Sequence, residues 1–78
     1  MTSEYEETRR FYLDQLTWLQ EQKRIYEEIE ALLLEMKDIA IEASEASVTD
    51  VERENLQEIM DELNKQVEAL YSQFDPIH

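Results

Sequence analysis

The chain contains no glycine and no cysteine, and its single proline is Pro76. Glycine and proline are the strongest breakers of a helix. A helix before Pro76 is therefore interrupted by neither of them. The lack of cysteine excludes disulfides and cysteine-ligated metal ions as sources of stability. A chain of 78 residues buries only about 60–65% of the surface that it would expose unfolded. Packing against another helical surface is therefore the remaining way to stabilise it.

The sequence has no run of β-branched residues, and it is rich in Glu, Leu, Gln, Ala, Ile and Lys, which favour helices. Two apolar series alternate spacings of four and three residues, as in the seam of a coiled coil. The first series is Ile25, Ile29, Leu32, Met36, Ile39 and Ala43, and the second is Leu56, Met60, Leu63, Val67, Leu70 and Phe74. We therefore predict an all-α protein, an antiparallel two-helix coiled-coil hairpin.

The turn is predicted between the two series. Thr49 is the expected N-cap of the second helix, because its hydroxyl can accept hydrogen bonds from the first turn and Glu52 follows at capping-box spacing. Ser47 with Asp50 forms an alternative capping box. A short connection of this kind permits only an antiparallel return. We predict one hairpin domain, with a first helix at about 3–46, a turn at 47–49, a second helix at about 50–74 and a tail at 75–78.

The two predicted helices differ in length. At about 1.5 Å per residue the first would measure about 65 Å and the second about 37 Å, so the second ends opposite residues 22–25. The part of the first helix before that point has no partner in the chain. It carries the predicted partner-binding residues: Phe11, Tyr12, Leu16, Trp18 and Leu19.

Two arrangements would cover these side chains, whose burial is worth about 1.5–3 kcal/mol each. A second copy packed head to tail would give a dimer with four helices, a four-helix bundle. Alternatively, a break near residues 20–23 would fold residues 3–19 back as a third helix.

Continuing the seam backwards from Ile25 gives Gln22, Trp18, Gln15 and Phe11. The two glutamines either lie at the solvent-exposed rim of the interface or are buried and fix the register of the helices. The neighbouring stripe of Tyr12, Leu16, Leu19 and Tyr26 is more apolar, so we expect the apolar face to change stripe near residues 20–25.

The charge balance excludes several partners. Seven Lys and Arg against twenty Asp and Glu give a formal net charge of −13, which repels nucleic acid and anionic lipid surfaces. No apolar stretch approaches the roughly 20 residues of a membrane span. The first residues are neither basic nor apolar, so we expect no cleaved signal peptide. We predict a cytoplasmic protein, or one exported without such a signal.

Residues for catalysis are also lacking. The single histidine is His78, and the Glu-x-x-His pattern of di-metal helical bundles is absent. There is no nucleophile with a neighbouring histidine and no glycine-rich phosphate loop. We therefore expect no enzymatic activity, no metal or other cofactor, and no small-molecule substrate.

The stretch from Leu33 to Ala43, followed by Val48 to Ile59, resembles the amino-terminal helical hairpin of bacterial flagellins and hook-filament junction proteins. Lys37-Asp38-Ile39-Ala40-Ile41 corresponds to the end of the first helix in that family, Thr49-Asp50 to the turn, and Glu52-Arg53 to the start of the return helix. The resemblance covers about residues 25–74. It implies a hairpin of filament-core type whose faces pack between neighbouring subunits, and export without a cleaved signal if the protein is flagellar.

Two functions follow from these patterns. The first is a structural or interaction protein that self-associates or docks helix on helix, as a homodimer or with another helical protein. The second is a small acidic chaperone or regulator that masks an amphipathic helix of a client protein.

Overall fold

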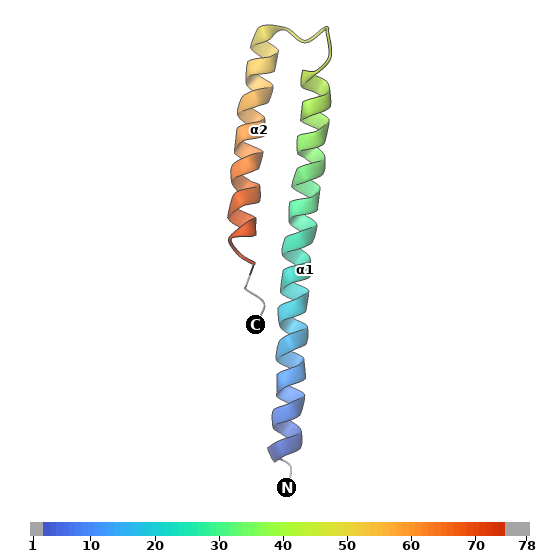
Figure 1. Cartoon of the computed structure of the whole chain (residues 1–78), viewed down its shortest axis with the longest axis vertical. Helices are drawn as coiled ribbons and strands as arrows, with labels where there is room; N and C mark the ends of the chain where they lie inside the picture. Colours follow the sequence, from blue (N-terminus) through green and yellow to red (C-terminus); the bar gives the residue numbers. More distant parts are fainter. Residues whose placement is uncertain (1–2, 75–78) are drawn as a thin grey trace.

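The computed structural model describes residues 3–74, which form two helices, α1 (Ser3–Ala43) and α2 (Asp50–Tyr71). The helices pack antiparallel into a rod whose principal extents are 73 × 16 × 14 Å, and α2 lies beside the part of α1 that precedes the turn (Figure 1). The predicted all-α hairpin with one longer helix is confirmed. The predicted tail at 75–78, with Pro76 and His78, lies outside the described residues.

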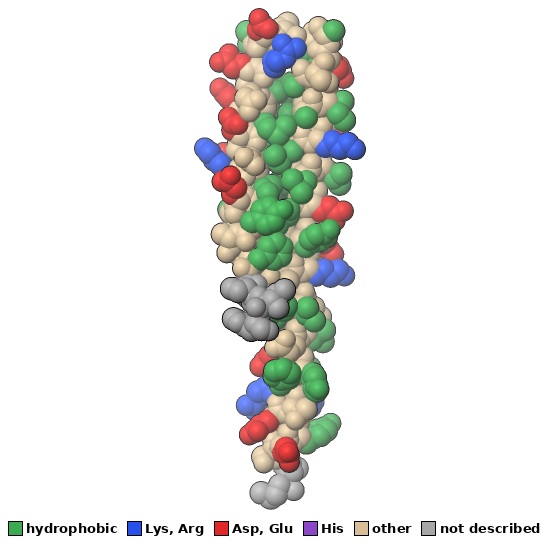
Figure 2. All heavy atoms as spheres, viewed as in Figure 1, with side chains coloured by type: hydrophobic (Ala, Val, Ile, Leu, Met, Phe, Trp, Pro, Cys, Tyr) green, Lys and Arg blue, Asp and Glu red, His purple; other side chains and the backbone are tan. Residues whose placement is uncertain are grey.

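The core is a single line of side chains between the helices. Ile25, Ile29, Leu63 and Val67 are only 4–8% exposed. Leu32, Met36, Leu70 and Phe74 are half-buried against the cluster of Ile25, Ile29 and Val67. Every member of the two predicted apolar series is buried or half-buried. Figure 2 shows hydrophobic side chains gathered along the line where the two helices meet. The heptad prediction of the seam is therefore confirmed.

Helix α1 is continuous, so the alternative with a break near residues 20–23 is wrong. Two ion pairs at i,i+4 spacing link this region to the next turn: Lys23 Nζ lies 3.8 Å from Glu27 Oε1, and Arg24 Nη1 lies 2.6 Å from Glu28 Oε1. Pairs of this kind stabilise a helix by a few tenths of a kcal/mol (about 0.2–0.5). With no glycine or proline nearby, nothing opposes continuation of the helix.

Both helices end earlier than predicted, and hydrogen bonds at each end explain why. After Ala43, the Oγ of Ser44 donates to Ile41 O at 2.6 Å, and Arg53 Nε of α2 donates to Ala43 O at 3.2 Å. A side chain of the partner helix thus satisfies a carbonyl that another helical turn would otherwise satisfy.

Helix α2 ends differently, through backbone hydrogen bonds of its own last residues. After Tyr71, the N–H of Gln73 donates to Leu70 O at 3.0 Å and the N–H of Phe74 donates to Tyr71 O at 3.2 Å. These i→i+3 hydrogen bonds form a tighter, 3₁₀-type turn at the end of α2. They leave Phe74 beyond the helix but still packed against the core.

Thr49 is the N-cap of α2, as predicted, and the alternative cap at Ser47 is not used. The Thr49 backbone is extended, with φ −75° and ψ 164°, and its Oγ1 accepts a hydrogen bond from Glu52 N at 3.1 Å. Asp50 and Glu52 lie in the first turn, where the helix dipole favours negative charge.

Because the core is one line of side chains, truncating a buried member should be costly. Ile29→Ala should lower the free energy of unfolding by about 2–3 kcal/mol, since it removes buried methylenes and leaves a cavity. Leu34→Ala is the matched control, because Leu34 is exposed on the same helix, and it should cost less than about 0.5 kcal/mol. Urea unfolding followed by circular dichroism measures both; equal losses would contradict the assigned core.

The cap gives a second stability prediction. Thr49→Ala should cost about 1 kcal/mol, because the Glu52 N–H loses its acceptor. Ser47→Ala removes the alternative cap and should have a much smaller effect in the same unfolding experiment. A larger loss for Ser47→Ala than for Thr49→Ala would show that α2 begins at a different residue.

Candidate interaction surface

An apolar stripe runs along α1 beside the seam. It consists of Tyr5, Tyr12, Leu16, Leu19 and Tyr26, and we call it the Tyr–Leu stripe. These side chains are 51–72% exposed. Tyr12, Leu19 and Tyr26 lie one residue after positions of the seam line, so the stripe flanks the seam on one side. Figure 2 shows apolar side chains continuing along α1 beyond the end of α2.

The structure divides the five predicted partner-binding residues between two faces of α1. Tyr12, Leu16 and Leu19 belong to the Tyr–Leu stripe and are exposed. Phe11 and Trp18 lie on the seam line, where Phe11 is exposed and Trp18 is half-buried. The rings of Phe11 and Tyr12 contact each other edge to face, with centroids 5.6 Å apart, which connects the two faces.

Burial along the seam continues toward the N-terminus through Gln22 to Trp18, and Gln15 is exposed. Gln22 and Trp18 are among the positions predicted by continuing the seam backwards from Ile25. The expected change of stripe near residues 20–25 is wrong, because the buried seam and the exposed Tyr–Leu stripe run side by side there. Tyr5 is not among the predicted partner-binding residues, although its spacing of seven residues from Tyr12 places it on the same helical face.

The other flank of the seam is acidic. Every seventh residue of α1 from position 7 is an exposed carboxylate, each one residue before a seam position: Glu7, Asp14, Glu21, Glu28, Glu35 and Glu42. Helix α1 thus has an apolar flank and an acidic flank on opposite sides of the same seam.

Charge also divides the protein along its length. We call residues 3–24, which precede the buried Ile25, the overhang, and residues 25–74 the hairpin body. The overhang has five acidic and four basic residues, a net charge of −1, whereas the body has fourteen acidic and three basic residues, a net charge of −11. The overhang is therefore the part that another acidic molecule can approach with least repulsion.

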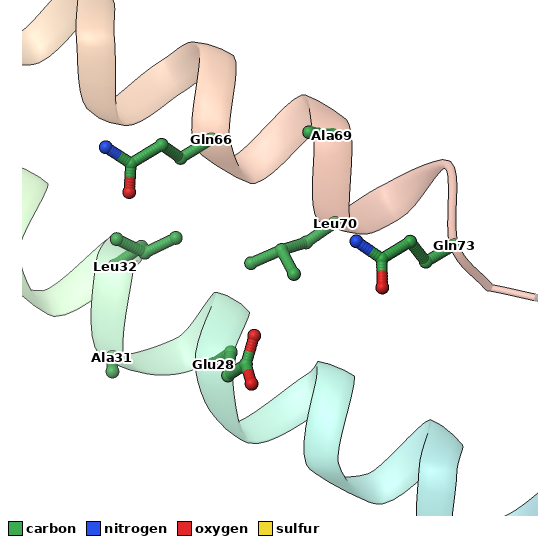
Figure 3. Close-up of a pocket in the computed structure, with 7 residues that line it drawn as sticks. All are labelled: Glu28, Ala31, Leu32, Gln66, Ala69, Leu70 and Gln73. Carbon is green, nitrogen blue, oxygen red and sulfur yellow. The ribbon is translucent and has the colours of Figure 1, made fainter.

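A shallow groove lies on the acidic flank of the hairpin body. Leu32 of α1 and Leu70 of α2 point toward each other across it, with Glu28, Gln66 and Gln73 around them (Figure 3). The small side chains of Ala31 and Ala69 also line it. Such a groove has the apolar floor and polar rim that can receive an amphipathic helix.

Other kinds of site find no support among the described residues. No group of three or more His, Asp or Glu side chains within residues 3–74 is arranged to hold a metal ion. Over the same residues, neither helix has the length and apolar character needed to cross a membrane. Comparison of the chain with protein-family models, with curated proteins and with solved structures found no match.

The charge of the hairpin body predicts how the protein responds to salt. Raising the NaCl concentration should raise the melting temperature, because screening weakens repulsion among the carboxylates. The double variant Glu35→Gln, Glu42→Gln removes two charges from the acidic flank, so it should melt higher at low salt and respond less to added salt. Thermal melts of both proteins across a salt series test this; a melting temperature that falls with salt would contradict it.

Proposed function

We propose that the protein is a non-enzymatic helical interaction protein that associates with a second copy of itself, helix on helix, through the overhang. The exposed Tyr–Leu stripe is the observation that carries this proposal. Its five side chains lie on one helical face, and burying each of them is worth about 1.5–3 kcal/mol. Isolated apolar residues on a surface need no explanation, but a contiguous row of this kind marks an interaction site.

The charge distribution supports a second copy as the partner. Two overhangs carry a net charge of only −1 each, so they can approach without the repulsion that would separate two hairpin bodies. Both also present the same apolar face, as a closed two-fold dimer requires. The resemblance of residues 25–74 to the flagellin hairpin, whose faces pack between subunits, agrees with a structural role in an assembly, including a flagellum or another secreted filament.

The groove in Figure 3 favours a second candidate, an acidic chaperone or regulator that holds a client helix. Glu28 beside the groove and the net charge of −11 on the hairpin body suit a basic amphipathic client. This function uses the body rather than the overhang, so the two candidates predict different sensitive residues.

Charging the Tyr–Leu stripe should abolish self-association. Leu16→Asp combined with Leu19→Asp places carboxylates in the buried contact, so the dimer should become monomeric while the helix content is retained. Leu34→Asp combined with Ile41→Asp adds the same charge at exposed apolar residues of α1 outside the stripe and should leave the dimer intact. Sedimentation equilibrium gives the mass and circular dichroism the helicity.

Two results would contradict the proposal. A wild-type protein that stays monomeric at high concentration has no self-association to explain. A stripe variant that still dimerises has its interface elsewhere. Binding of a basic amphipathic peptide that is lost in Ala31→Asp or Ala69→Asp, two exposed residues lining the groove, with a monomeric wild type, would instead support the chaperone.

A further inference from the structure

The Tyr–Leu stripe has the spacing of a second coiled-coil seam. With two cations included, its members alternate steps of four and three residues: Tyr5, Arg9, Tyr12, Leu16, Leu19, Lys23 and Tyr26. Arg9 lies within the stripe, since it lines one hollow of the helix surface together with Tyr5, Tyr12 and Leu16. The stripe therefore specifies a partner helix and also limits the registers in which that helix can pack.

We propose that two copies pair antiparallel along this stripe, about a two-fold axis between Leu16 and Leu19, so that each Leu16 faces Leu19 of the partner subunit. This inference rests on the proposed self-association and adds its register. In this register Tyr12 faces Lys23 of the partner subunit, and Arg9 faces Tyr26 of the partner subunit. The two-fold axis repeats each contact.

The pairing follows from the two classes of position in the stripe. The residues reached by a step of three are Tyr12, Leu19 and Tyr26, and those reached by a step of four are Arg9, Leu16 and Lys23. In an antiparallel pair the two helices run in opposite directions. When a step of four on one helix lies beside a step of four on the other, each residue of one class faces a residue of the other class. Allowed registers then differ by one heptad, which is about 10 Å along the axis.

Among these registers, the proposed one matches side chains best. It places leucine against leucine at the centre and a cation against a tyrosine ring on both sides, where the ring face attracts the charge. One register shifted by a heptad instead sets Leu19 opposite Arg9 of the partner subunit. The register shifted the other way sets Leu19 opposite Lys23 of the partner subunit. Each alternative places the charged end of a side chain against an aliphatic one, where a charge lacks a compensating group.

The register also keeps the acidic parts apart. Each hairpin body extends away from the two-fold axis, so the middles of the two bodies lie about 50 Å from each other along the particle. This is several times the screening length of about 8–10 Å at physiological salt. The net charge of −11 on each body then opposes dimerisation only weakly, whereas overlap of the bodies would oppose it strongly.

The absence of cysteine from the sequence permits a direct test by disulfide cross-linking of the full-length chain. A mixture of Tyr12→Cys and Lys23→Cys proteins should form a mixed disulfide under mild oxidation at least about tenfold faster than either protein alone cross-links to itself. Cysteines at matching positions of two copies would be separated by about 16 Å along the axis, because they lie eleven residues out of register. Mass spectrometry identifies the mixed product.

The control pair is Tyr12→Cys with Leu16→Cys, which face each other only in the register shifted by one heptad. Faster cross-linking of this pair than of Tyr12→Cys with Lys23→Cys would overturn the proposed register. A wild-type dimer in sedimentation whose cysteine variants also dimerise but do not cross-link would overturn it as well, while self-association would stand. A monomeric wild type would overturn both the register and the proposed function.

Discussion

The structure depends on the difference in length between its two helices. Helix α1 has 41 residues and α2 has 22, so only part of α1 can be covered from within the chain. The shared core is one line of side chains, and an isolated helical pair of this size has little buried surface with which to offset the loss of conformational entropy. The uncovered part of α1 instead exposes six large apolar side chains within one helix: Tyr5, Phe11, Tyr12, Leu13, Leu16 and Leu19.

The two helices also differ in the number of neighbours that their sequences accommodate. Beside its seam, α2 carries Gln57 and Asn64, so that flank is polar until Tyr71. The equivalent flank of α1 carries Tyr5, Tyr12 and Leu19, which are exposed. An apolar seam alone suits a helix with one neighbour, whereas a seam with one apolar flank suits a helix in a bundle. Helix α1 covers the apolar seam of α2, whereas the apolar flank of α1 stays exposed.

The sequence predicts the parts of the fold that depend on periodicity and local capping. Both seams follow from spacings of four and three, and Thr49 follows from the affinity of a hydroxyl for the N–H groups of a first turn. The helix ends were harder to predict. Helix α1 ends at Ala43, where the carbonyl accepts a hydrogen bond from Arg53, a residue ten positions away. Phe74 packs against the core although α2 has already ended, so the seam extends past the end of the helix that carries it.

The candidate surface was predicted only in part, because position along the chain does not show which face of a helix is covered. Phe11, Tyr12, Leu16, Trp18 and Leu19 are close in sequence, yet burial of Trp18 assigns it to the seam while Leu16 and Leu19 stay exposed. The same distinction applies to charge. A formal charge of −13 describes a molecule that repels its own copies, but the repulsion acts between local surfaces and decays within about a Debye length. Since most of the excess charge lies on the hairpin body, the nearly neutral overhang is where an apolar contact between copies meets the least electrostatic opposition.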